Sequence, residues 1–146
     1  MTWAVRGHGV FRDEGAGVQG PLRVSAREDL PEMGLVTSSR VDPERRRRLV
    51  DVGVRDHGTL RSVGVKVGEL VTRRADIYVS EHPISYWDSC APLVILAEAG
   101  GLMTHLDGTP FDYALDPARR ARHPGPLVAS NGARHADLCA LFAAAW

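Results

Sequence analysis

The chain has 146 residues, of which 44% are hydrophobic, so it suits one domain, or part of a larger one, with a core of its own. Its 18 basic side chains balance 18 acidic ones, which favours neither nucleic-acid binding nor a membrane surface. No apolar run approaches the ~20 residues of a membrane span, and the start MTWAVRGHGVF lacks the apolar stretch of a signal peptide. Two widely separated cysteines, Cys90 and Cys139, favour a reduced, cytoplasmic protein.

The first third of the sequence predicts strands joined by glycine-rich turns. Residues 2–11 read as a hairpin arm that begins with the first residue, which suggests a start within a fold. Residues 12–21 read as a polar loop, and residues 22–26 as a second short strand. Residues 34–40 read as a buried strand that ends in hydroxyl groups.

Helices and strands then alternate. A helix is expected over 42–53, because Asp42 suits the N-cap, Pro43 the first turn and Gly53 the position after the end. A loop with Ser62 and Gly64 is expected to lead into a helix ending near residue 74. A strand is expected at 76–79, followed by a helix at 88–101 with Asp88 as its N-cap and Pro92 near its first turn. The remaining expected segments are a strand at 102–106, a turn at 107–110, a polar loop at 117–126, a strand at 126–130 and a terminal helix from 133. This alternation predicts an α/β fold, a layered mixed sheet with flanking helices.

Three short stretches carry side chains suited to chemistry. Asp88 is explained either as an ordinary helix cap or as a fixed carboxylate ligand. Ser62-x-Gly64-x-Lys66 is either a solvated turn or an anion-binding helix entrance, and Lys66 is the sole lysine beside 17 arginines. The third stretch is Ser38, Ser39 and Arg40, at the end of a predicted strand. It is either a simple strand terminus or a set of side chains that contacts a phosphate or a sugar.

Other common motifs are missing from the sequence. The six histidines show no metal-binding spacing, and there is no P-loop, G-x-S-x-G or C-x-x-C. The Asp-Gly-Thr of LDGTP, residues 106–110, follows a strand and precedes a proline, so we interpret it as a turn.

Taken in order, six segments resemble the C-terminal half of the inositol monophosphatase superfamily. They are GLVTSSR, RSVGVK, ADIYV, YWDSCAPLVILAEAGG, THLDGTPFDY and GPLVASNG. The Cys-Ala-Pro after Asp88 resembles the 3′(2′),5′-bisphosphate nucleotidase branch most. The resemblance covers essentially residues 1–146 and implies the C-terminal part of the family's α/β/α/β/α sugar-phosphatase fold.

The resemblance also implies a function and a cofactor. Family members are Mg²⁺-dependent phosphomonoesterases, and the aspartate of the Trp-Asp pair is a metal ligand, so Asp88 is the expected ligand here. Ser62 and Lys66 match a loop that contacts phosphate or ribose. Ser38, Ser39 and Arg40 match the start of a loop that contacts the substrate in the nucleotidases. Glu81 matches a glutamate that binds a substrate hydroxyl group in the inositol branch.

Two departures qualify this expectation. Arg61 stands where the family loop usually has glycine. The family's N-terminal half, with its D-P-x-D-G-T motif and most metal ligands, has no counterpart here, and one carboxylate holds Mg²⁺ poorly. We therefore expect an isolated chain with little or no activity, from a truncated, mis-started or split gene, that associates with an N-terminal half or with itself.

Three functions follow as hypotheses. The first is part of a nucleotidase that converts 3′-phosphoadenosine 5′-phosphate to AMP and phosphate. The second is part of an inositol or sugar monophosphatase, and it depends on Glu81. The third is a non-catalytic remnant that binds a nucleotide or a partner chain.

Overall fold

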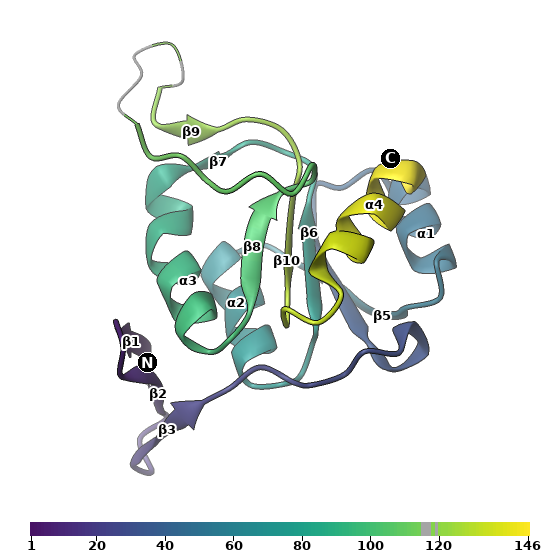
Figure 1. Ribbon diagram of the computed structural model, residues 1–146. Coiled ribbons are helices and arrows are strands. Elements are labelled where there is room, and N and C mark those ends of the chain that lie inside the picture. The colour runs from purple at the N-terminus through teal and green to yellow at the C-terminus, as the bar shows by residue number, and fades with distance from the viewer. Residues whose placement is uncertain (115–117, 119) are drawn as a thin grey trace.

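A computed structural model describes residues 1–114, 118 and 120–146 (Figure 1). Its centre is a five-stranded sheet of order β5-β4-β6-β10-β8. The strands are β4 (Gly34–Ser38), β5 (Arg55–Leu60), β6 (Ile77–Ser80), β8 (Leu102–His105) and β10 (Leu127–Ser130). β4 pairs in parallel with β5 and β6, whereas β10 pairs antiparallel with β6 and β8, so the sheet is mixed.

Helices cover both faces of this sheet. Figure 1 shows α2 (Val63–Val71) and α3 (Tyr86–Glu98) on one face, and α1 (Pro43–Asp51) and α4 (His135–Ala145) on the other. Because successive strand residues point to opposite faces, neighbours in β6 divide between two cores. Ile77 packs with the α1/α4 core and Tyr78 with the α2/α3 core.

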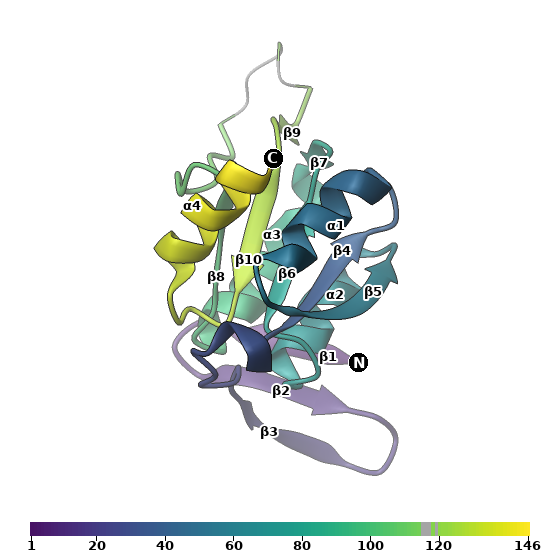
Figure 2. The ribbon, with the colours of Figure 1, turned by 90° about the vertical axis from the view of Figure 1, so that its right-hand side faces the viewer.

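A small antiparallel sheet lies at the C-terminal end of α3 (Figures 1 and 2). It contains β1 (Thr2–Val5), β2 (Gly9–Asp13) and β3 (Val18–Leu22), in that order. Val10 is fully buried in the α2/α3 core, whereas four of the five β3 residues are exposed. The molecule is thus a layered α/β structure, as the sequence predicts, and none of the helices within the described ranges has the length and apolarity needed to cross a membrane.

Several elements differ from the sequence-based expectation. The third strand of the small sheet occupies 18–22, so it lies in the predicted loop except for residue 22, which it shares with the predicted strand at 22–26. β5 was not predicted, because it is an edge strand with mostly exposed residues and reads as a polar turn. A two-stranded ladder was also missed; it joins β7 (Ile84–Ser85) to β9 (Arg122–His123). Residues 117 and 119 of the predicted polar loop lie outside the described residues.

The start of α3 also differs from the prediction. Ser85 is the N-cap, and Asp88 lies inside the first turn of the helix. Asp88 is therefore not the cap, because the β7–β9 ladder ends at Ser85 and the helix begins directly after it. Pro92 lies in the helix interior, and since proline has no N–H, the usual helical bond to the Asp88 carbonyl is missing. Gly64 likewise belongs to α2 and not to a loop.

Candidate functional site

The carboxyl ends of β4, β5 and β6 lie at the same end of the sheet, because these three strands are parallel. A cleft of about 1000 Å³ lies at this end, and the first residues of α2 and α3 contribute to its wall. Helix N-termini carry partial positive charge, which favours an anionic ligand. Six of the seven predicted site residues line the cleft: Ser38, Ser39, Arg40, Ser62, Lys66 and Asp88.

Lys66 forms the buried floor of the cleft. Its side chain is 0% exposed, and its ammonium donates to Ser38 Oγ at 2.9 Å and to the carbonyls of Leu60 and Arg61 at 3.1 and 3.2 Å. The ammonium also lies 4.5 Å from the ring centroid of Tyr78, a cation–π contact. Burial lowers the pKa of Lys66 to about 8. All three ammonium hydrogens are thus used within the protein, and the positive charge has no carboxylate partner in the described part of the chain.

Hydroxyl groups surround the lysine. Ser38 Oγ lies 3.2 Å from Ser80 Oγ, so the ends of β4 and β6 are joined beside the ammonium. The Tyr78 hydroxyl is buried and has no hydrogen-bond partner among the described residues. Burial raises the pKa of Tyr78 above its ordinary value, so the phenol stays protonated at neutral pH. The hydroxyls of Ser38, Ser80 and Tyr78 thus lie together beside the buried ammonium.

Ser62 has a structural role in addition to its place in the cleft. It is the N-cap of α2, and its hydroxyl accepts a hydrogen bond from Val65 N at 3.4 Å. This bond fixes the helix entrance beside Arg61, whose carbonyl binds Lys66. The loop between β5 and α2 is therefore held from both its ends.

Asp88 projects from the first turn of α3 as an exposed carboxylate. Within the described residues it forms no salt bridge and no side-chain hydrogen bond. The helix around it is held firmly: Tyr86 N donates to Ala121 O at 2.9 Å, and Ser89 Oγ lies 2.9 Å from His123 Nε2. Asp88 is consequently a fixed, unpaired carboxylate at the mouth of the cleft.

The described residues do not complete a magnesium site. They contain no group of three or more histidine, cysteine, aspartate or glutamate side chains placed to hold one metal ion. Mg²⁺ needs near-octahedral oxygen coordination, and Asp88 is the single carboxylate that lines the cleft. The described part of this chain therefore places one carboxylate in the cleft, and the role of Asp88 as a metal ligand stays a prediction.

Arginines and a tryptophan complete the cleft. Arg61 and Arg122 line it beside Arg40, and Trp87 lies at its edge with 67% of its surface exposed. Arg122 was not expected from the sequence, because it lies in a polar stretch and belongs to the unpredicted β9. The sequence offered only a weak signal, an arginine directly before a histidine. The structure shows that this histidine, His123, lies within hydrogen-bond distance of Ser89 in α3.

Glu81 stands apart from the cleft. Its carboxylate accepts a hydrogen bond from Asp42 N at 3.0 Å and forms a salt bridge with Arg45, both at the start of α1. It is not one of the cleft-lining residues. The role of Glu81 toward a substrate stays a prediction, and its contacts here are with α1.

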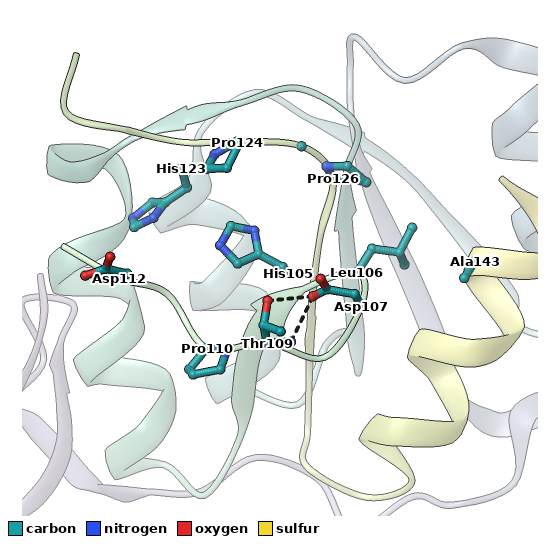
Figure 3. A pocket seen from close by; sticks show the side chains of 11 residues that line it. His105, Leu106, Asp107, Thr109, Pro110, Asp112, His123, Pro124, Pro126 and Ala143 are labelled. Carbon is teal, nitrogen blue, oxygen red and sulfur yellow. Dashed lines mark hydrogen bonds between the residues drawn. The ribbon is translucent and has the colours of Figure 1, made fainter. Parts of the chain in front are cut away.

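A second cavity, of about 570 Å³, lies between the β8 turn and β9 (Figure 3). The rings of His105 and His123 lie in its wall. Asp107 also faces it, but its carboxylate accepts hydrogen bonds from Thr109 N at 2.9 Å and Thr109 Oγ1 at 2.6 Å. Asp107 thus closes a turn, as predicted for LDGTP, and this cavity contains none of the predicted site residues.

Comparisons with known proteins agree on one family. Residues 1–145 match the model of the inositol monophosphatase family. A histidinol-phosphatase of Streptomyces coelicolor is 30% identical over 140 residues, which is 93% of this chain and 48% of that protein. A 3′(2′),5′-bisphosphate nucleotidase 1 of Dictyostelium discoideum is 28% identical over 144 residues, which is 96% of this chain and 44% of that protein.

Solved structures show the same fold. The inositol monophosphatase of Anabaena superposes with a TM-score of 0.64 at 27% identity, over 95% of this chain and 57% of that one. The inositol monophosphatase of Thermotoga maritima gives a TM-score of 0.69 at 23% identity, over 94% and 52% of the two chains. The chain therefore spans about half the length of the curated relatives that it matches.

Proposed function

Because this chain belongs to the inositol monophosphatase family, we propose that it supplies the C-terminal part of the active site of a phosphomonoesterase. The observation that carries the proposal is the cleft at the ends of the parallel strands, which both Lys66 and the exposed Asp88 line. A buried cation beneath two helix N-termini attracts phosphate, and a free carboxylate at the mouth suits a hard metal ion.

In this proposal the cleft residues divide into two groups. Asp88 is one ligand of Mg²⁺, and the other ligands come from residues outside the described part of this chain. Ser38, Ser39, Arg40, Ser62 and Lys66 form the side of the cleft that receives the substrate. The metal polarises phosphate in reactions of this class. The 146 residues act as one C-terminal domain, which is inactive alone.

For the substrate, we propose a 3′,5′-bisphosphate nucleotide. The cleft is lined by three arginines and Lys66 against one carboxylate, so it favours ligands with more than one anionic group. Histidinol phosphate carries an amino group, which such a cleft repels. The charge of this part of the cleft therefore favours the bisphosphate over histidinol phosphate, the two kinds of substrate named by the curated relatives.

Two alternatives have less support. An inositol or sugar monophosphatase would use Glu81, whose carboxylate binds Arg45 and the Asp42 N–H. A non-catalytic binding protein is favoured by the shortage of metal ligands in the described residues. Both keep an anionic ligand in the same cleft. The first differs from the main proposal in its substrate, and the second differs in having no reaction.

The test is phosphate release by the native gene product, purified at the length that the cell makes, with and without millimolar Mg²⁺. The substrates are adenosine 3′,5′-bisphosphate, histidinol phosphate and inositol 1-phosphate. We expect Mg²⁺-dependent release, fastest from the bisphosphate and abolished by Asp88→Asn. Release from none of the three would reject the phosphatase proposal, and faster release from either monophosphate would reject the nucleotide.

A further inference from the structure

Arg122 enters the cleft from an element that the site described above does not otherwise use. Several arginines outside the cleft have a carboxylate partner, such as Arg27 with Asp76 and Arg74 with Glu69, whereas Arg40, Arg61 and Arg122, which line the cleft, have none among the described residues. Arg122 forms no side-chain hydrogen bond or salt bridge within the described residues, although it lies on a strand and not on a loose loop. An arginine left unpaired in a cleft is available to a ligand.

The position of Arg122 is fixed by contacts on both sides in the chain. Its Cα pairs with that of Ser85 in the β7–β9 ladder, and Ser85 is the N-cap of α3. The preceding residue, Ala121, accepts a hydrogen bond from Tyr86 N at 2.9 Å. The following residue, His123, is 2% exposed and lies within hydrogen-bond distance of Ser89. Arg122 therefore moves with the helix that carries Asp88.

The other three cations lie elsewhere in the cleft wall: Arg40 follows β4, Arg61 lies between β5 and α2, and Lys66 lies in the first turn of α2. Arg61 and Lys66 lie at the β5–α2 connection, where the Arg61 carbonyl accepts a hydrogen bond from Lys66 at 3.2 Å. One group of positive charge thus comes from the α2 entrance and a second from the strand bound to α3. Two separate cationic positions suit a ligand whose anionic groups are also separate, because guanidinium binds phosphate oxygens in a directed way.

We propose that Arg122 binds the second, non-reacting phosphate of the substrate and so sets the preference of this cleft for a nucleoside bisphosphate over a monophosphate. This inference rests on the proposed function, since it assumes that the cleft receives the substrate. Trp87 adjoins Asp88 in the same cleft with its indole largely exposed, and offers a planar surface to a nucleobase. The ligand class is therefore a nucleotide with phosphates on two sides of its ribose.

The experiment is isothermal titration of the 146-residue chain with adenosine 3′,5′-bisphosphate and with AMP, without metal. The variants are Arg122→Gln, Arg122→Lys and the control Arg48→Gln, which removes one exposed cation from the last turn of α1. We expect the wild-type chain and Arg48→Gln to bind the bisphosphate about tenfold more tightly than AMP. Arg122→Gln should lose most of that preference, with little change for AMP, and Arg122→Lys should restore part of it. Circular dichroism melting checks that all variants fold.

Each other result has a distinct meaning. If Arg122→Gln keeps the wild-type preference, Arg122 does not hold the second phosphate, although the nucleotide proposal stands. If the wild-type chain binds both nucleotides equally, the inference fails and the phosphatase proposal still depends on its own assay. If the chain binds neither nucleotide, the inference is overturned irrespective of any phosphate release by the native gene product.

Discussion

The carboxylate of Glu98, in the last turn of α3, accepts a hydrogen bond from the backbone N–H of Gly7 at 2.9 Å. Its second oxygen accepts one from Gly9 N at 3.1 Å, so a single side chain closes over the turn between β1 and β2. The Glu98 carbonyl is also bonded by Arg23, which follows β3. The same helix carries Asp88 at its other end, so Glu98 connects the small sheet to the element that presents the candidate metal ligand.

Replacing Glu98 with alanine should release the β1–β2 turn. Gly7 and Gly9 would lose their acceptors, so we expect faster amide hydrogen exchange at both residues while the central sheet stays protected. The matched control is Glu28→Ala, since Glu28 is exposed and its carboxylate forms no hydrogen bond or salt bridge within the described residues. Unchanged exchange at the two glycines would show that strand pairing alone holds the turn.

The same contact should respond to acid. The hydrogen bond from Gly7 lowers the pKa of Glu98 below its ordinary value. A carboxyl group with a lowered pKa in the folded state stabilises that state above its unfolded pKa, and this contribution is lost as the pH falls through the folded pKa. We therefore expect exchange at Gly7 to accelerate as the pH falls through this lowered pKa, after correction for the intrinsic rate. Glu98→Ala should show no such additional step.

Lys66 should make stability rise at alkaline pH. Its pKa is about 8 in the folded chain, against an ordinary value of 10.5. Below pH 8 the lysine is charged in both states; between the two values the folded state has released a proton that the unfolded state keeps, so stability rises with pH. We expect the wild-type free energy of unfolding to gain about 2 kcal/mol over Lys66→Met between pH 8 and 10.

Urea denaturation at several pH values measures this difference. Arg48→Met serves as the control, because it makes the same kind of change, a cation to methionine, at an exposed position outside the cleft. Its difference from the wild type should stay constant with pH. A constant difference for Lys66→Met as well would mean that the buried ammonium keeps an ordinary pKa.

Ser89 should be important for stability although it lies beside an exposed residue. Its hydroxyl is fully buried, lies 2.9 Å from His123 Nε2 and accepts a hydrogen bond from Tyr113 at 3.0 Å. Ser89→Ala would leave these polar groups without that partner, and we expect a loss of about 1–3 kcal/mol in the free energy of unfolding. Cys90→Ala, an exposed neighbour on α3, should change stability by less than about 0.5 kcal/mol. Equal effects would argue against a structural role for the Ser89 network.

The sequence was most informative where local order determines the site. Ser38 ends β4 and Lys66 lies in the first turn of α2, two elements whose strand or helix character is clear from the sequence, and the ends of parallel strands bring such residues to one side of the sheet. Asp88 was recognised, but its place in α3 was not, because a two-residue ladder determines where the helix begins. Arg122 could not be found by periodicity, since that ladder pairs it with Ser85 from a distant segment and two residues carry no pattern.

Asp88 alone should not hold magnesium. The described part of the chain groups no three metal-binding side chains, and one exposed carboxylate binds Mg²⁺ weakly. A ligand stabilises a protein only when its concentration approaches the dissociation constant. We therefore expect about 5 mM Mg²⁺, as in the phosphatase assay, to leave the melting temperature of the 146-residue chain unchanged. Asp88→Asn should behave as the wild type does in this assay, although it should abolish phosphate release by the native gene product. A Mg²⁺-dependent rise in melting temperature that Asp88→Asn removes would mean that this chain completes a metal site by itself, and the proposal of a site divided between two parts would then be wrong.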